Sequence, residues 1–367
     1  MTLEEKIRRL KEALREESEE EMARFDVKKA GEDGVPNCEA YLIGTKEVMR
    51  DRFPCPAGGW DSLEPWQKLC CYKVSDESDE YKGVDCDTAL RSTVIYQLAF
   101  GYGNSMKIEK YGKGRYQLEH GGLILRGDTM NSYATTVRQF LKTCPHDPER
   151  VGSFLGRASN GKWGVLAPYT DMCGTAHWDA AVLGEYDYFK SIIPPASEDF
   201  YRLCHTAGNF IPVPPAFQSR GGRGSPTCDY WDLALLYIYQ DRLRADDTEC
   251  TLERLAGSEK RAWACRSWLD ECFGKGQDGW DAFVERNFLQ DFVGGKERPY
   301  GPPRQLWRGH FEGAVMPQRG VEADGEPFDQ FSEFFTHAAQ WMAARGLRIA
   351  KAVQDALRAE EQGAAAD

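Results

Sequence analysis

The segment MKIEKYGKGRYQLEHGGLILRG, from 106 to 127, restricts the fold more than any other part of the chain. Gly112, Gly114, Gly121 and Gly122 divide it into three short stretches that have the composition of β-strands. Glycines at this spacing are typical of tight turns between antiparallel strands. The segment therefore predicts a small antiparallel sheet at about 106–127.

Helical patterns dominate the rest of the chain. The segment 87–100 has a helical composition. In the helix expected from 228 on, the apolar set Trp231, Leu235, Ile238 and Leu243 predicts deep burial. The further predicted helices are 130–142, 177–190, 197–206, 228–244, 258–273, 279–292, 328–344 and 346–361. We expect an α+β protein that is mainly helical.

The N-terminal residues 3–24 predict a charged amphipathic helix. Leu3, Ile7, Leu10 and Leu14 recur at alternating four- and three-residue spacing, as in the apolar seam of a coiled coil. Two heptads are too few for a free-standing coiled coil. The helix is therefore expected to dock either on its own chain or on a partner, which includes a second copy in a homo-oligomer.

Length and composition suggest one large domain with an appendage. The chain has 367 residues, and the stretch 26–88 is rich in proline, glycine and acidic residues. We predict an N-terminal charged helix and loop-rich appendage at 1–88 and a main α+β domain at 89–362.

Charge and hydropathy exclude several classes of function. The 46 Lys and Arg residues stand against 58 Asp and Glu residues, which gives a formal net charge of −12. An acidic surface repels phosphate groups, so general nucleic-acid binding and binding to anionic membranes are disfavoured. No apolar run resembles a signal peptide or a membrane span. We expect a soluble cytoplasmic protein in which most of the 12 cysteines are reduced thiols.

Two motifs that suggest cofactors are incomplete. The segment GRASNGKW (156–163) fits a phosphate-binding loop only up to its lysine, because Trp163 replaces the required Ser or Thr and GVLAPYTD is not a helix start. The segment TDMCGTAH (170–177) supplies Cys and His, but no nearby pair completes four zinc ligands. We expect neither a metal nor another cofactor.

The polar stretch GDTMNSYATT (127–136) has two interpretations. Asp128 or Thr129 could cap a helix that starts near Met130. Alternatively, Asp128, Thr129 and Asn131 form part of a binding site, since a strand end leading into a helix N-terminus favours anions.

Three further residues complete the hypothetical site. His205 is a candidate general base, and Asp128 is the other candidate for a catalytic role. Arg220 and Arg223, in the proline- and glycine-rich connector 211–227, are candidate anion clamps.

Several segments resemble, in order, an uncharacterised bacterial family whose domain has no known function. They are GGLILRGDTMNSYATTVRQFL, YRLCHTAGNFIPVP, DYWDLALLYIYQDR, WDAFVERNFLQDFV and FFTHAAQWMAARGLRI. The resemblance covers residues 90–350 and implies no activity. It implies a shared pattern that includes Asp128, Thr129, Asp232, Gln290 and Asp291. The chain departs from that pattern in its N-terminal extension and in the insert at 145–195.

The late segment RNFLQDFV also has a physical interpretation. Phe288, Leu289, Phe292 and Val293 can be buried while Gln290 and Asp291 face away. A buried Asp291 would need a donor such as Arg220 or Arg223.

Two functions of different class remain open. The protein is either a binding protein that engages a protein partner through its N-terminal helix, or an enzyme or binder of an anionic small molecule or nucleotide at the Asp128–Thr129 turn. The sequence slightly favours the first, because it contains no complete catalytic motif.

Overall fold

The computed structural model describes residues 2–16, 88–102, 105–112, 115–132, 136, 139–140, 143, 155–157, 163–165, 191–203, 206–217, 230–243, 252–256, 258–313 and 316–364. Within these ranges the protein is mainly helical and contains a small antiparallel sheet. This confirms the predicted α+β class. The predicted helix at 177–190 lies outside the described residues. Of the one predicted at 130–142, residues 130–132, 136 and 139–140 are described, and 136 and 139–140 are helical.

The sheet forms where the glycine pattern predicted it. Its strands, in spatial order, are β1 (Lys107–Gly112), β2 (Arg115–His120), β3 (Leu123–Thr129) and β6 (Phe210–Val213). Gly121 and Gly122 make the turn between β2 and β3 with φ angles of 57° and 90°, which residues with a side chain rarely adopt.

The fourth strand corrects the sequence analysis. The segment 211–227 was predicted as a connector, but Phe210–Val213 pairs with β3 in antiparallel register, with Thr129 opposite Phe210 and Arg126 opposite Val213. All four residues of β6 are buried. Pro212 inside the strand, and Pro214 and Pro215 directly after it, obscured a strand whose partner lies far away in the sequence.

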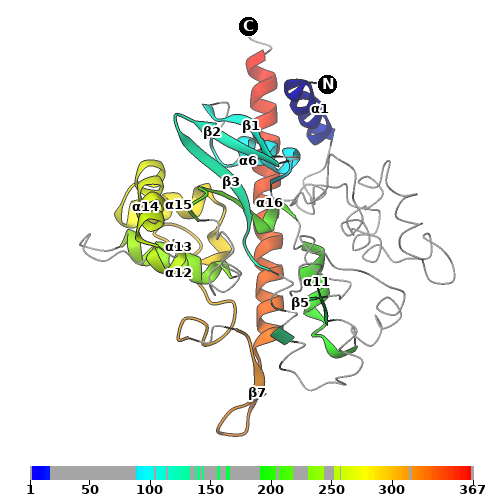
Figure 1. Cartoon of the computed structure of the whole chain (residues 1–367), viewed down its shortest axis with the longest axis vertical. Helices are drawn as coiled ribbons and strands as arrows, with labels where there is room; N and C mark the ends of the chain where they lie inside the picture. Colours follow the sequence, from blue (N-terminus) through cyan, green and yellow to red (C-terminus); the bar gives the residue numbers. More distant parts are fainter. Residues whose placement is uncertain are drawn as a thin grey trace, which may run out of the picture.

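One long helix forms the axis of the molecule. Figure 1 shows α16 (Gln330–Ala364) running along its length, with α6 (Leu90–Ala99) between α16 and the sheet. The predicted break between 328–344 and 346–361 was wrong, because the helix continues through Gly346. Its buried positions follow a three- and four-residue spacing, the pattern of one helical face against a core. They include Phe331, Phe335, Ala338, Met342, Arg345, Ile349, Val353 and Leu357.

Four helices gather on one side of α16 (Figure 1). They are α12 (Trp231–Arg242), α13 (Glu253–Ala256), α14 (Glu259–Phe273) and α15 (Gly276–Arg286). The helix predicted at 279–292 begins and ends earlier. After Asn287, Phe288 adopts a left-handed φ of 57° and a short 3-10 helix, η6 (Gln290–Phe292), follows.

The N-terminal helix docks on its own chain. In α1 (Leu3–Glu16), Leu14 is fully buried, and Leu3, Ile7 and Leu10 pack against the core. Lys11 pairs with Glu360 of α16 at 2.6 Å. This contact is the intramolecular alternative that the sequence left open.

The remaining elements are short. They are α11 (Ala196–Leu203), the 3-10 helix η4 (Ala207–Asn209), the hairpin of β4 (Leu155–Arg157) and β5 (Trp163–Val165), and the hairpin of β7 (Arg319–Val321) and β8 (Pro327–Asp329). Trp163 starts a strand, which confirms that GRASNGKW is not followed by the helix that a phosphate-binding loop needs.

Candidate functional site

The start of α12 carries the most unusual polar group among the described residues. Asp232, the second residue of α12, is fully buried. Its Oδ1 accepts a hydrogen bond from the N–H of Leu233 at 3.0 Å, so it satisfies one of the amides left open at a helix start. A carboxylate here also has a favourable interaction with the helix dipole. The helix start therefore stabilises a buried negative charge.

The other carboxylate oxygen of Asp232 holds a loop that is far away in the sequence. Asp232 Oδ2 accepts from the N–H of Leu306 at 2.8 Å and lies 2.6 Å from Nδ1 of His310. Because Nδ1 contacts a carboxylate oxygen, the arrangement favours the tautomer that carries its proton on Nδ1. Asp232 thereby orients the imidazole of His310.

Aromatic rings enclose the imidazole. The ring of His310 stacks on Trp307 with centroids 3.5 Å apart, and Tyr230 meets its face edge-on at 5.5 Å. His310 is 1% exposed, and its Nε2 has no hydrogen-bond partner within the described part of the chain. Within these residues the second ring nitrogen is therefore buried and free to accept a hydrogen bond or a proton.

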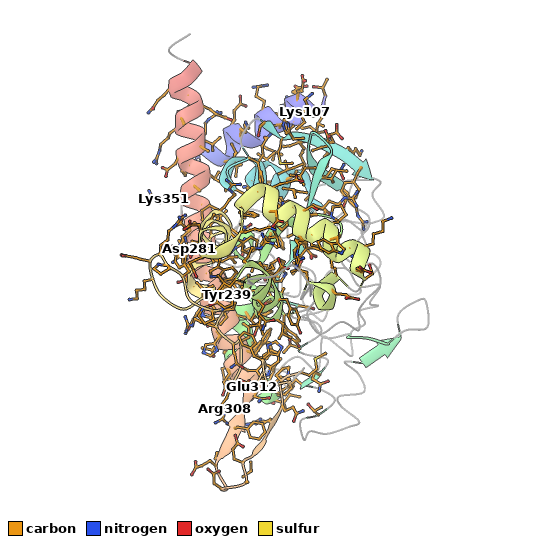
Figure 2. The ribbon with its side chains drawn as sticks, turned by 90° about the vertical axis from the view of Figure 1, so that its left-hand side faces the viewer. Lys107, Tyr239, Asp281, Arg308, Glu312 and Lys351 are labelled. Carbon is orange, nitrogen blue, oxygen red and sulfur yellow. The ribbon has the colours of Figure 1, made fainter. Side chains whose placement is uncertain are left out.

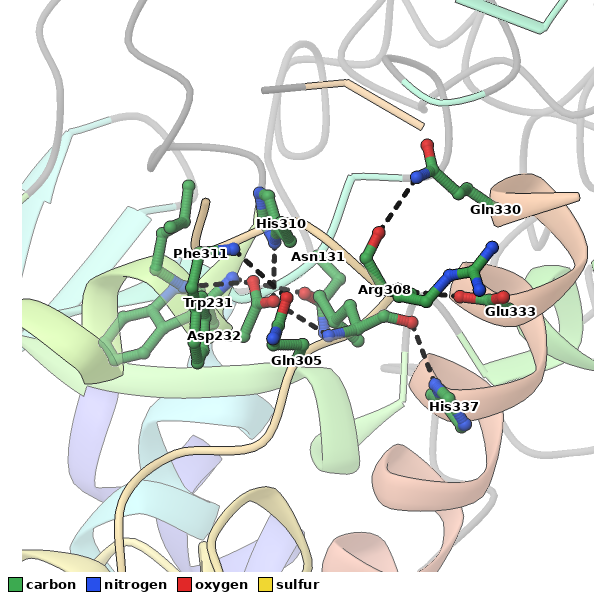
Figure 3. Close-up of polar contacts among 12 residues, drawn as sticks. Asn131, Trp231, Asp232, Gln305, Arg308, His310, Phe311, Gln330, Glu333 and His337 are labelled. Atoms are coloured by element: carbon green, nitrogen blue, oxygen red, sulfur yellow. Dashed lines mark hydrogen bonds and ion pairs between the residues drawn. The ribbon is translucent and has the colours of Figure 1, made fainter. Parts of the chain in front are cut away.

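Helix α16 fixes the loop that carries His310. Figure 3 shows Gln330, Glu333 and His337 reaching from α16 to this loop. Gln330 Nε2 donates to the carbonyl of Arg308 at 2.8 Å, and Glu333 Oε2 accepts from the N–H of Arg308 at 2.7 Å. Nδ1 of His337 lies 2.8 Å from the carbonyl oxygen of Leu306. The loop is thus held by α12 on one side and by α16 on the other.

The outer part of the same loop is exposed and charged. Arg308 pairs with Glu322 at the end of the β7–β8 hairpin. Figure 2 shows Arg308 and Glu312 close together, at the opposite end of the molecule from Lys107 of β1. The charged side chains lie outside the buried pair and do not neutralise Asp232.

Asn131 connects the end of β3 to the start of α12. Its Oδ1 accepts from the N–H of Trp231 at 3.3 Å, and its backbone forms a bridge with Tyr230. Asn131 is fully buried, and its Nδ2 has no partner among the described residues. The structure therefore brings two of the predicted site residues, Asn131 and Asp232, to one place.

Asp128 and Thr129 have different positions from those expected. Both lie inside β3, opposite Ile211 and Phe210, and both are half-buried. Met130, where a helix start was expected, forms a bend, and Asn131 belongs to a β-bridge. The prediction that Asp128 or Thr129 caps a helix at Met130 was wrong, because both residues belong to β3 and none of residues 130–132 is helical.

The remaining predicted residues lie apart from this pair or outside the described residues. Asp291 and Gln290 are half-buried in η6, while Leu289, Phe292 and Val293 are buried, as the sequence predicted. Asp291 accepts two hydrogen bonds from Arg348 of α16. His205, Arg220 and Arg223 lie outside the described residues.

Sequence reasoning missed His310. It is one of six histidines, in the segment WRGHFEG, and its neighbours Trp307 and Phe311 are aromatic. An isolated histidine between an aromatic residue and glycines is a weak signal. Its partner Asp232 lies 78 positions earlier, so only the fold reveals the pair.

The pKa values of other groups are shifted as well. Burial lowers the pKa of the fully buried Arg345 to about 9, so its guanidinium stays charged at neutral pH. Burial raises the pKa of the half-buried Cys272 thiol, which disfavours the reactive thiolate at this position. The hydrogen bonds of Arg345 run to the backbone of Asn287, Gly208 and Phe210 and not to the Asp232–His310 pair.

The described ranges contain neither a cluster of metal ligands nor a membrane-spanning helix. Within them, no three His, Cys, Asp or Glu side chains are grouped as a metal site requires. No helix in the described ranges combines the length and the apolar character needed to cross a bilayer.

Comparison with models of protein families, with curated proteins and with solved structures finds no match to this chain. The resemblance to an uncharacterised bacterial family therefore stays a prediction.

Proposed function

We propose that the protein is an enzyme acting on a small molecule, with His310 as general base and Asp232 as the group that orients it. The observation that carries this proposal is a buried imidazole with one nitrogen held by a buried carboxylate and the other without a partner among the described residues. A carboxylate at Nδ1 leaves the lone pair of Nε2 ready to accept a proton. It also stabilises the imidazolium formed when the proton arrives.

A structural role alone explains the site less well. The bond between His310 and Asp232 would stabilise the fold, but leaving Nε2 buried and unpaired costs about 1–3 kcal/mol. A residue with no polar atom there would avoid that cost. An unsatisfied buried group in a native structure calls for an explanation, and a catalytic role is one that fits an imidazole.

The chemistry that follows is activation of an O–H group. Nε2 of His310 can remove a proton from water or from a substrate hydroxyl, and the resulting oxygen nucleophile attacks an electrophilic carbon or phosphorus. Hydrolysis and group transfer both begin with this step. Substrate must reach a ring that is 1% exposed, so catalysis requires the loop around His310 to open.

The partner-binding function has less support. The apolar seam of α1 is covered by its own chain, with Leu14 fully buried. A partner would meet the charged face of α1 instead, where Arg8 pairs with Glu12. Recruitment of a protein partner through this helix stays a prediction.

The test combines chemical modification with activity measurements. Diethyl pyrocarbonate acylates neutral imidazole nitrogens, and mass spectrometry of peptides measures the rate at each histidine. We expect slow but measurable reaction at His310. Asp232→Asn should suppress it, because an amide N–H facing Nδ1 moves the ring proton to Nε2.

Activity is screened with chromogenic esters, amides and phosphoesters. Any turnover should disappear in His310→Gln and in Asp232→Asn, while His120→Gln keeps it, since His120 is exposed at the end of β2. Turnover that survives in His310→Gln, or a His310 that never reacts, would contradict the proposal.

A further inference from the structure

Two buried asparagines connect β6 to the Asp232–His310 pair. Asn209 Oδ1 accepts from the N–H of Asn131 at 3.0 Å, and Asn209 Nδ2 donates to the carbonyl of Asn131 at 3.0 Å. Both residues are fully buried. The side chain of Asn209 thus takes the place of a neighbouring strand and fixes the backbone of Asn131.

Asn131 passes this constraint to α12. Trp231 is the first residue of α12, and Tyr230 before it makes no side-chain cap. The Oδ1 of Asn131 accepts the N–H of Trp231 instead, from a position 100 residues earlier in the chain. An amide at a helix start needs an outside acceptor. Asn131 supplies it one residue before Asp232.

The other end of the connection is anchored in α16. The fully buried Arg345 donates from Nη1 to the carbonyls of Gly208 and Phe210, both at 2.8 Å, on either side of Asn209. The backbone N–H of Met130 also donates to the carbonyl of Asn209 at 2.8 Å. Asn209 is therefore held in place through its own backbone and through its neighbours.

Both members of the pair are consequently positioned from one helix. Arg345 acts on Asp232 through Asn209 and Asn131, whereas Gln330 and Glu333 hold the loop of His310. A carboxylate and an imidazole must meet within a few tenths of an ångström for a short hydrogen bond. Two separate supports on the same rigid helix provide that precision.

We propose that Asn131, held by Asn209, is a positioning residue that sets the carboxylate of Asp232 on Nδ1 of His310. This proposal rests on the proposed function, since it assigns the residues that prepare the general base. The side chain of Asn131 bonds to Trp231 of α12 and not to the imidazole, so Asn131 acts through α12. The unpartnered Nδ2 of Asn131 is a consequence of turning Oδ1 toward the N–H of Trp231.

The test follows the Nδ1 proton of His310 by NMR in the full-length chain. A ring N–H bonded to a buried carboxylate gives a resolved downfield resonance that exchanges slowly with water. In Asn131→Ala and in Asn209→Ala we expect this proton to exchange about fivefold to tenfold faster, the change that loss of one ordinary hydrogen bond produces. Asn131→Asp keeps an acceptor for Trp231 and should restore slow exchange.

Asn287→Ala is the matched control. Asn287 is also fully buried, and its Nδ2 donates to a backbone carbonyl, that of Phe283, but it has no bond to the start of α12. This variant should lose stability without changing the His310 resonance. The positioning role is refuted if Asn131→Ala and Asn287→Ala speed up exchange of the His310 ring proton equally. It is also refuted if neither Asn131→Ala nor Asn209→Ala changes that exchange rate.

The design separates this proposal from the proposed function. A wild-type protein without the downfield resonance, or without modification at His310, refutes the general base itself. A wild type with both signals, and an Asn131→Ala variant that retains them, refutes only the positioning role. Where Asn131→Ala does not fold, Asn209→Ala and Asn131→Asp give the same comparison.

Discussion

Gly208 and Met342 bring the short helix η4 and the long helix α16 into direct backbone contact. A Cβ at position 208 would lie 2.0 Å from the carbonyl oxygen of Met342 and 3.2 Å from the backbone nitrogen of Gly346. A Cβ cannot lie 2.0 Å from a backbone oxygen, so this approach requires glycine at 208.

Gly208→Ala should destabilise the protein by about 3 kcal/mol, near the upper part of the range for overpacked cores. The added methyl group must push η4 away from α16 and weaken the bonds from Arg345. The free energy of unfolding from urea titration measures this. Gly363→Ala is the control, because nothing lies within 4 Å of its Cβ position, and it should leave stability unchanged or raise it by up to ~1 kcal/mol.

Arg345→Met should cost about 3 kcal/mol or more, because it removes a charged donor from several buried carbonyls. The bonds run to Asn287, Ala207, Gly208 and Phe210. Arg345→Lys should recover only part of the loss, since a single ammonium cannot reach acceptors spread over two planar edges. Thermal and urea unfolding of the three proteins provide the comparison. Equal stability of the methionine variant and the wild type would show that these bonds contribute little.

Leu14→Ala should destabilise the protein by about 2–4 kcal/mol, as expected for a fully buried leucine. The carbonyl of Leu14 also accepts from Nε2 of Gln354 in α16 at 3.2 Å, so Leu14 joins α1 to α16 through its backbone. Arg8→Ala, on the exposed face, should change stability by less than ~0.5 kcal/mol.

Native mass spectrometry of the same variants tests the partner hypothesis. Because the seam of α1 is covered within the chain, Leu14→Ala should leave the oligomeric state unchanged. A shift from oligomer to monomer in Leu14→Ala alone would show that the seam serves a second copy as well.

The fold was predictable where the pattern is local. Gly121 and Gly122 mark the β2–β3 turn, and Trp231, Leu235 and Ile238 are buried in α12 as predicted. Leu243, predicted to be buried with them, is exposed, because α12 ends at Arg242 and Leu243 is its C-cap. The strand at Phe210–Val213 was missed because its partner β3 lies far away in the sequence.

The candidate site was predictable only in part, for the same reason. Asn131 and Asp232 were both named from the sequence, but nothing local indicates that they meet or that His310 joins them. Convergence depends on contacts between residues separated by 78 to 100 positions. The residues that support the pair, such as Asn209 and Glu333, have no distinguishing pattern of their own.

The ion pair between Glu285 of α15 and Arg298 predicts a defined pH dependence. Arg298 Nε donates to Glu285 Oε1 at 2.7 Å, and this hydrogen bond lowers the pKa of Glu285 below its ordinary value of 4.5. A carboxylate whose pKa is lower in the folded state binds fewer protons there than in the unfolded chain. Its contribution is therefore complete above pH 4.5 and is lost as the pH falls through the lower folded value.

Glu285→Gln should accordingly lower the Tm at pH 7 by about 1–2 °C, the size expected for an exposed ion pair in a chain of this length. The difference from wild type should shrink steadily below pH 4.5 and also shrink in high salt. In an Arg298→Gln background the same substitution should have little effect at either pH, because the partner is already gone. A Tm difference that stays constant from pH 7 to pH 3 would instead assign the effect to packing of the Glu285 side chain and not to its charge.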